Sequence, residues 1–372
     1  MERRWSVRLA VGLVFSVFIS LALAGVAMAQ TKGTSEGKRK IIKLRAVSGH
    51  PTAAFWTYQV QKFLVPELKK QVLAQTKGYQ LEIEELYGGS VAKLGEELEA
   101  LESGIADIGT VCIVFEMSKL HPHQFAWWFP FGSTDLIQVT KASNLTYEKF
   151  PFLDQVFTKY KQKRLALAGT GSYEFVTTFP IQRLEDMKRK RMAHGGPMVP
   201  WLEAIGSVGV QSRLNEAYTA LQTGVYDGWA MEPVSTVGFK LHEVAPYYTI
   251  AGLGAGIPTV VNISLNAWNK LPKEVQDIVV KVGKEYEKVN AEASMANHAE
   301  KIEFMRKSGT KISKLSESER IRFANAMNGA LVANTMAKES DKMGFLGSEM
   351  ARYYIKVLGD IGYKWPIIPT IK

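Results

Sequence analysis

The amino-acid sequence predicts a two-lobed α/β protein, with a mostly parallel sheet and flanking helices in each lobe. Strand-like and helix-like segments alternate up to Phe115, an order that produces right-handed crossovers and parallel strands. The chain has 372 residues, more than one hydrophobic core normally holds. A second alternating series begins near Arg164, and later strand-like segments return to the first lobe. We therefore expect strands that cross between the lobes and act as hinges.

The N-terminal residues 1–29 have the layout of a secretory signal peptide. Arginines precede an apolar run over residues 9–26, and Ala27-Met28-Ala29 forms a small-x-small cleavage site. A membrane anchor is the alternative, because the apolar stretch is just long enough to span a bilayer. No basic stop-transfer cluster follows at once. We expect cleavage and export, with a flexible polar leader over residues 30–40.

The first lobe is expected to comprise residues 41–160 and 248–300. Its first strands are predicted from branched apolar or alternating patterns at residues 41–47, 79–87 and 105–115. Helical spacing of apolar residues lies between them. Ligands of parallel sheets bind beyond the carboxyl ends of the strands. The residues at these ends are His50, Tyr87 and Phe115 or its neighbours, and we expect them at a crevice.

The second lobe is expected to comprise residues 161–247. Strands are predicted at 165–169, 175–179 and 192–195, and helices at 200–205 and 215–222. Two further strands, at 247–251 and 259–265, are expected to return to the first lobe. Pro272 begins a long helix with one apolar face that reaches about residue 307. Residues 301–372 are expected to end in helices, near 317–338 and 348–358, that pack on the lobes. We find no internal repeat.

Charge and reactive residues argue against several classes of protein. The formal net charge is +10, yet basic residues are scattered apart from Lys38-Arg39-Lys40 and residues 188–191. A nucleic-acid-binding protein would concentrate them beside a readable motif, whereas a mild positive field attracts anionic solutes. His121-Pro-His123 alone makes a poor metal site, and the single Cys112 lies in an apolar run typical of a buried strand. No nucleophile, base or phosphate loop was found, so we expect no enzyme, no metal and no cofactor.

A short segment carries the most specific signal. Glu216-x-Tyr218-x-Ala220-Leu221-Gln222-x-Gly224-Val225-x-Asp227-Gly228 resembles the core signature of the DctP family, the extracytoplasmic solute receptors of TRAP transporters. Residues 87–107, with two extra residues before Leu94, residues 128–131 and residues 268–276 are also similar to family segments. The resemblance covers most of residues 40–365. It implies a periplasmic solute-binding protein fold that closes on a small organic solute without catalysis. It also implies the periplasm as location, and as partners the small and large integral membrane subunits of the transporter.

One departure from the family pattern concerns specificity. The resemblance implies an arginine at position 193 that pairs with a substrate carboxylate through a two-pronged hydrogen bond, but this chain has Ala193. Arg191, two residues earlier, would share a strand face with residue 193. It matches an outward lysine of the family, so its use as a replacement stays an open alternative.

Eleven residues are therefore candidate ligand contacts. Aromatic stacking and apolar burial could supply the affinity that the missing arginine does not, although some of the aromatic residues could instead be ordinary core. Glu232, His194 and Asn262 could contact the ligand, and a surface or capping role for Glu232 is the alternative. The candidates are Phe55, Trp56, Tyr87, Tyr173, Phe175, Ala193, His194, Asn215, Trp229, Glu232 and Asn262.

The expected ligand is an aromatic or otherwise largely apolar organic acid. A C4-dicarboxylate, sugar acid or keto acid is the alternative, and it would need a replacement cation such as Arg191, Arg213 or a bound metal. A sensor or lipid-handling protein of the same fold is a further alternative.

Overall fold

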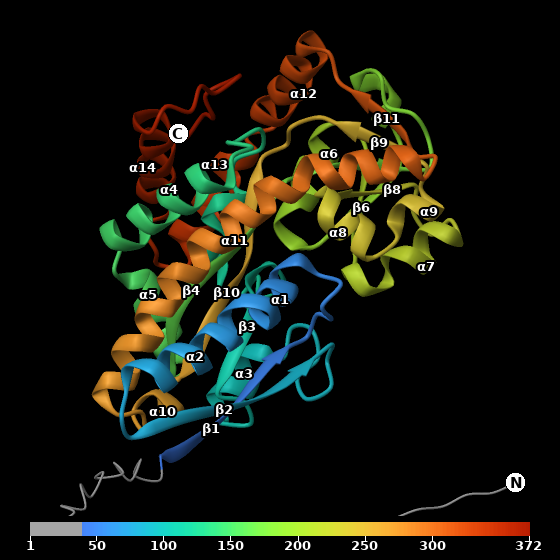
Figure 1. Cartoon of the computed structure of the whole chain (residues 1–372). Helices are drawn as coiled ribbons and strands as arrows, with labels where there is room; N and C mark the ends of the chain where they lie inside the picture. The colour runs from blue at the N-terminus through green and yellow to red at the C-terminus, as the bar shows by residue number, and fades with distance from the viewer. Residues whose placement is uncertain (1–38) are drawn as a thin grey trace, which may run out of the picture. The chain divides into compact units, whose positions relative to one another are not determined.

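The computed structural model describes residues 39–372 (Figure 1). The predicted signal peptide, residues 1–29, and most of the predicted leader lie outside the described residues. Across residues 39–372, no helix has both the length and the apolar character needed to cross a membrane.

The first sheet has five strands in the order β2-β1-β3-β10-β4. β1 pairs in parallel with β2 and β3, whereas β10 runs antiparallel to both β3 and β4. The strands are β1 (Lys40–Ser48), β2 (Tyr79–Tyr87), β3 (Ile108–Cys112), β4 (Gln162–Ser172) and β10 (Ala255–Ser264).

The second sheet has six strands in the order β11-β9-β5-β8-β6-β7. β5 is antiparallel to β8 and β9, and the other neighbours run parallel. The strands are β5 (Glu174–Thr177), β6 (Arg191–His194), β7 (Val208–Gln211), β8 (Gly228–Met231), β9 (Tyr247–Ile250) and β11 (Lys311–Lys314).

The α/β fold with two sheets is confirmed, but two strands lie in the sheet opposite to the predicted one and a third was not predicted. β4 was expected in the second lobe and lies in the first sheet, beside β10. β9 was expected to return to the first lobe and lies in the second sheet. β11 adds a strand to a region where only helices were predicted. Both sheets are mixed: two of the four strand pairings in the first sheet and three of the five in the second are parallel. The antiparallel pairings arise because strands leading into and out of a crossing run in opposite directions.

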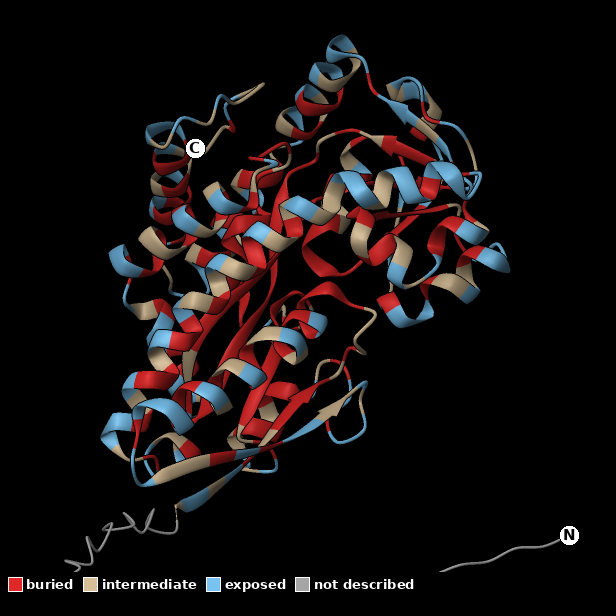
Figure 2. Ribbon diagram, in the orientation of Figure 1, coloured by how far each residue is buried: buried red, intermediate tan, exposed pale blue. Residues whose placement is uncertain are grey.

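Helices cover both sheets, and their apolar faces account for their positions. The inner strands are largely buried and the edge strands β2, β7 and β11 are partly exposed, whereas α11 (Lys273–Lys307) buries one face and exposes the other (Figure 2). The predicted buried face of α11 is confirmed at Val275, Ile278, Val279, Val282 and Tyr286. The other helices are α1 (Phe55–Gln59), α2 (Val65–Gln75), α3 (Glu97–Glu102), α4 (Leu136–Lys149), α5 (Phe152–Lys159), α6 (Val199–Ala204), α7 (Ala217–Gln222), α8 (Pro233–Gly238), α9 (Leu241–Val244), α10 (Leu265–Trp268), α12 (Glu317–Gly329), α13 (Val332–Lys342) and α14 (Gly347–Asp360).

Three segments pass from one sheet to the other. Tyr173 alone joins β4 to β5, residues 251–254 join β9 to β10, and α11 leads from the side of β4 to β11 (Figure 1). The first two segments are hydrogen-bonded to each other: the Tyr173 N–H donates to the Gly254 carbonyl at 3.0 Å, and the Leu253 N–H donates to the Tyr173 carbonyl at 3.1 Å. The two extended connections therefore form one paired strap.

A turn is repeated in the two sheets, which the sequence analysis did not detect. Ala-Leu-x-x-Gly-x-x-Asp occurs as residues 100–107 and again as residues 220–227. Asp107 accepts a hydrogen bond from the backbone N–H of Arg45 on β1, and Asp227 accepts one from Arg191 on β6, both at 2.8 Å. Each aspartate also pairs with the guanidinium of the same arginine. The two α–β units thus share the same turn sequence and the same aspartate–arginine contacts.

Candidate functional site

An enclosed pocket lies where loops and strands of the two sheets meet. The free space within it is about 30 Å³, which holds roughly two water molecules. The first sheet and its connections contribute His50, Trp56, Cys112, Val114, Phe115, Trp127 and Pro258. The crossing and the second sheet contribute Tyr173, His194, Gly195, Leu214, Trp229 and Met231.

Aromatic rings make up much of the pocket wall. The His194 ring lies 5.8 Å from Trp127, 5.4 Å from Tyr173 and 5.8 Å from Trp229, measured between ring centroids. Trp127 meets Tyr173 edge to face at 4.9 Å. His50 meets Trp56 in the same way at 4.9 Å. These separations are typical of favourable aromatic pairs, so the rings hold one another in place and give the wall a mainly apolar, aromatic surface.

The pocket wall is uncharged at neutral pH. Among the described residues that line it, none is Lys, Arg, Asp or Glu. Burial lowers the pKa of His50 to about 3 and that of His194 to about 4, because a buried imidazolium loses its hydration. His194 Nδ1 lies 2.8 Å from the Gly195 carbonyl oxygen, which can only accept. Nδ1 therefore carries the proton, and Nε2 is left as an acceptor.

Three tryptophans line the pocket, and their indole N–H groups differ. Trp127 Nε1 donates to the Ile257 carbonyl at 2.9 Å. Trp56 Nε1 and Trp229 Nε1 are buried and have no hydrogen-bond partner within residues 39–372. Buried donors of this kind are uncommon and call for an explanation.

The position of Trp229 follows from the local sequence. Asp227 holds the start of β8 against β6 through the Arg191 N–H. Gly228 lies so close to Met192 that an added Cβ would be 2.6 Å from its sulfur. In this register Ala193 pairs with Trp229, and paired residues point to the same face of a sheet. Trp229 thus occupies the face on which an arginine at position 193 would project.

Close approach of the two sheets at the pocket depends on two glycines. A Cβ on Gly195 would lie 3.2 Å from the Phe115 ring. A Cβ on Gly196 would lie 2.5 Å from the Val114 carbonyl oxygen. These contacts bring the end of β6 directly against the segment after β3, so the pocket is closed in this structure.

Four predicted site residues lie together in the pocket wall, namely Trp56, Tyr173, His194 and Trp229. Trp56 lies in α1 after β1, Tyr173 follows β4, His194 ends β6, and Trp229 is the second residue of β8. Ala193 is fully buried on the same face as Trp229 but does not line the free space.

The remaining six predicted residues lie outside the pocket wall. Phe55 is buried behind Trp56, and its N–H donates to Ser235 Oγ. Phe175 packs on Phe323, and Asn215 is exposed. The Asn262 side chain donates to Gln162 Oε1 at 2.9 Å. Tyr87 is half-buried at the end of β2.

Glu232 has the capping role that the sequence left open. Its carboxylate accepts from the Val234 and Ser235 N–H groups at the start of α8, at 2.5 and 2.9 Å. Burial raises the pKa of this carboxyl group. Glu232 is fully buried and does not line the pocket.

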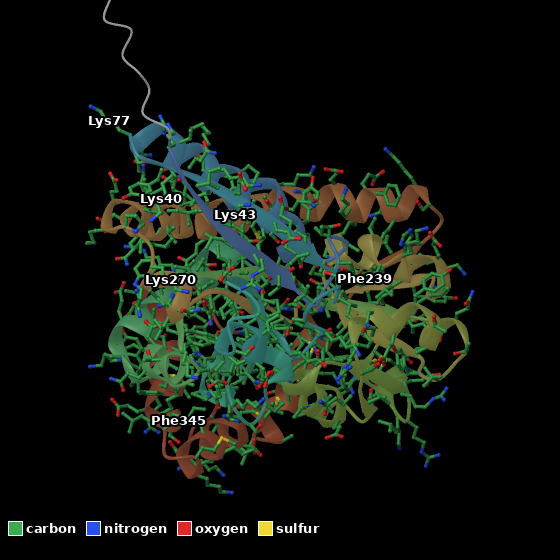
Figure 3. The ribbon with its side chains drawn as sticks, turned by 90° about the horizontal axis from the view of Figure 1, so that it is seen from below. Lys40, Lys43, Lys77, Phe239, Lys270 and Phe345 are labelled. Carbon is green, nitrogen blue, oxygen red and sulfur yellow. The ribbon has the colours of Figure 1, made fainter. Side chains whose placement is uncertain are left out.

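The cations proposed to replace the missing arginine lie away from the pocket wall. Arg191 Nη2 pairs with Asp227 Oδ1 at 2.9 Å, and Arg213 is exposed. Figure 3 shows Lys40, Lys43 and Lys77 at the β1–β2 edge of the first sheet, and none of them lines the pocket. No group of three or more metal-ligating side chains occurs in the described part of the chain.

Several pocket residues were not among the predicted contacts. His50 and Phe115 were expected at the crevice from their positions after strands. Trp127, Cys112, Met231 and Pro258 were missed, because each lies in an apolar run whose pattern indicates only burial. For Trp127 the signal was the aromatic cluster of residues 125–131, which was interpreted as core.

Comparisons with known proteins agree with this architecture. Residues 57–339 match the family model DctP, described as bacterial extracellular solute-binding protein, family 7. A solute-binding protein of Sulfitobacter sp. strain NAS-14.1 is 27% identical over 218 residues, which are 55% of this chain and 64% of that protein. The chain spans about half the length of the curated relatives that it matches.

Solved structures share the fold at low sequence identity. A TRAP solute-binding protein of Rhodoferax ferrireducens T118, in complex with copurified benzoate, superposes with a TM-score of 0.74 and 16% identity, covering 86% of this chain and 98% of that one. DctP7 of Bordetella pertussis, an extracytoplasmic solute receptor binding pyroglutamic acid, has a TM-score of 0.70 and 18% identity over 84% and 99%.

Proposed function

The chain belongs to the DctP family of bacterial extracellular solute-binding proteins, and from this premise we propose that it is the periplasmic receptor of a TRAP-type transporter. In this role it captures a small organic acid, aromatic or largely apolar, between its two sheets. It then delivers the acid to the small and large membrane subunits. The family is one of non-catalytic binding proteins, in line with the expectation that the chain is not an enzyme.

The observation that carries the ligand class is the uncharged aromatic wall. Trp56, Trp127, Tyr173 and Trp229 line a pocket without a lysine or arginine. A ligand with two carboxylates would bring two charges into this space. Burying a charge without a counterion is costly, whereas a flat apolar body gains both area burial and ring contacts.

The relatives support an organic acid and leave its type open. The Rhodoferax protein was found with benzoate and the Bordetella protein binds pyroglutamic acid. A dicarboxylate would need a cation at the pocket. A sugar acid or keto acid has one carboxylate, as benzoate does, but it offers less apolar surface to the aromatic lining. Arg191 is paired with Asp227, and Arg213 does not line the wall.

Thermal-shift and calorimetric screening of acids tests the proposal. We expect benzoate and phenylacetate to raise the melting temperature by a few degrees at concentrations near 100 times Kd, where bound ligand stabilises the fold by about 2.7 kcal/mol. Succinate, galacturonate and pyruvate should give no shift. Stabilisation by any of these three, with no effect of the aromatic acids, would overturn the ligand class.

A further inference from the structure

The pocket wall contains two hydrogen-bond donors for which residues 39–372 offer no acceptor. The indole N–H groups of Trp56 and Trp229 belong to side chains that are 3% and 2% exposed, and neither has a partner among residues 39–372. Both residues line the pocket. Trp127, in the same wall, donates to Ile257 instead. Three tryptophans elsewhere in residues 39–372 also have unpaired indole N–H groups, but they do not line the pocket. What distinguishes Trp56 and Trp229 is therefore their place in the pocket wall.

The neighbouring space is small in this closed structure and has to widen before it can hold a ligand. The free volume of about 30 Å³ admits roughly two water molecules. In this structure both indole nitrogens are sealed from solvent, so water does not satisfy either N–H group. A ligand oxygen that reaches them removes the cost of an unpaired buried donor.

The same wall provides an acceptor but no counter-charge. His194 Nδ1 is committed to the Gly195 carbonyl, so Nε2 presents a lone pair. A carboxylate has only acceptors and gains nothing from this lone pair, whereas an amide or hydroxyl group can donate to it. Lys, Arg, Asp and Glu are missing from the described pocket lining. The wall therefore complements a polar group that accepts and donates but carries no net charge.

We infer that Trp56 and Trp229 hold an oxygen of the ligand through their indole N–H groups. The pocket binds this oxygen without requiring a negative charge on the ligand. The inference rests on the proposed function and specifies how the polar end of the ligand is bound. The receptor accepts the uncharged amide of an aromatic acid about as well as the acid itself. Its ligand class thus extends from aromatic carboxylates to aromatic carboxamides.

Calorimetric titration of the full mature chain with benzoate, benzamide and toluene tests the charge rule. We expect the dissociation constants for benzoate and benzamide to lie within tenfold of each other, and toluene to bind more weakly than benzamide. Benzoate favoured over benzamide by more than tenfold overturns the inference and leaves the proposed function standing. If neither binds and succinate does, the proposed function fails and the inference falls with it.

Substitutions of the three tryptophans test the donors. Trp56→Phe and Trp229→Phe each remove one orphan N–H, and we expect about tenfold weaker binding of benzamide, which corresponds to about 1.4 kcal/mol, with toluene affinity changed less than threefold. Trp127→Phe is the matched control, because it also removes a wall indole whose N–H is already used. It should weaken benzamide and toluene alike. Equal losses for both ligands in all three variants contradict the assigned donors.

A measurement on the unmodified protein covers the case in which a variant fails to fold. With ¹⁵N-labelled tryptophan, two of the indole N–H signals should shift downfield on addition of benzamide, as expected for newly formed hydrogen bonds. Toluene should not produce this shift. If benzamide binds and no indole N–H signal shifts downfield, the inference is wrong.

Discussion

Glu232 shows that a residue in a family signature segment can be structural in this chain. Its two carboxylate oxygens accept the first free N–H groups of α8. Such groups have no partner within the helix and favour an acceptor side chain at the cap. The cap fixes the segment that follows Trp229 and Met231, so Glu232 acts on the pocket only through the backbone.

Replacing this cap should reduce stability and leave ligand binding nearly unchanged. Glu232→Ala is expected to lower the free energy of unfolding by about 1–2 kcal/mol, the usual range for losing a capping side chain. Urea unfolding at pH 7 measures it. Glu349→Ala, at an exposed position of α14, is the control and should change stability by less than about 0.5 kcal/mol. A loss of benzoate affinity above threefold in the folded Glu232→Ala protein would instead place Glu232 at the ligand.

At the residue scale, the sequence predicted residues near turns better than residues within apolar runs. Trp56, His194 and Trp229 were identified because each lies near a turn or glycine that borders a strand. Trp127 and Met231 lie inside apolar runs, where a pocket residue and a core residue have the same pattern. Which of them reaches free space depends on contacts between segments distant in sequence.

At the scale of elements, two helical glycines have opposite roles. Gly283 in α11 packs on β4, and a Cβ there would lie 2.5 Å from the Leu165 carbonyl oxygen. Gly359 in α14 has nothing within 4 Å of its Cβ position. Only the first glycine is required by packing, because a backbone oxygen cannot move aside as a flexible side chain can.

Alanine at the two positions should therefore give opposite results. Gly283→Ala is expected to destabilise the fold by about 1–3 kcal/mol through overpacking. Gly359→Ala should stabilise it by about 0.5–1 kcal/mol, since alanine loses less conformational entropy in a helix. Chemical unfolding of the two variants side by side gives the comparison. Equal effects would mean that α11 does not depend on this close approach.

The elements themselves were largely predictable, whereas strand pairing was not. Alternating polarity and β-branched residues predicted most of the strands, and apolar residues at helical spacing after Pro272 predicted α11. The local sequence of β4 does not show whether the strand pairs with β10 or with β5, because a buried position in either sheet requires the same apolar residues. The repeated turn escaped notice for a similar reason: its equivalence lies in Asp107 and Asp227 bonding to Arg45 and Arg191, which are far away in sequence.

At the scale of the whole molecule, a buried carboxyl group secures the paired strap. Glu174 follows Tyr173, and its Oε2 accepts from the Ala251 and Gly252 N–H groups at 2.6 and 2.7 Å. Burial raises the pKa of Glu174 from 4.5 to about 7, and Arg320 nearby opposes this only in part. The ionisation of one group is thus linked to the connection between the two sheets.

This linkage should appear in the pH dependence of stability. A folded pKa above the unfolded one means that the folded protein binds more protons between pH 4.5 and 7, so the free energy of unfolding falls as pH rises through this window. Glu174→Gln lacks the titration. The stability of this variant relative to wild type should therefore rise by on the order of 3 kcal/mol from pH 4.5 to pH 8.

Urea unfolding at several pH values checks the expectation for Glu174. The low pKa values of His50 and His194 act in the opposite direction, but they are common to both proteins and cancel in the difference. Glu82→Gln, at an exposed position on β2, is the matched control and should show no such trend. A flat difference between Glu174→Gln and wild type would mean that Glu174 ionises normally in the fold.

The single-residue crossing at Tyr173 constrains how such a receptor can evolve. The backbone of Tyr173 is the connection between β4 and β5, and its side chain is part of the pocket wall. A mutation there changes which compounds fit and how the sheets move at the same time. Ligand specificity can therefore change more easily through substitutions at Trp56 and Trp229, because the backbones of these two residues are not part of the paired strap. Related receptors that have diverged in ligand should differ at those two positions before they differ at this one.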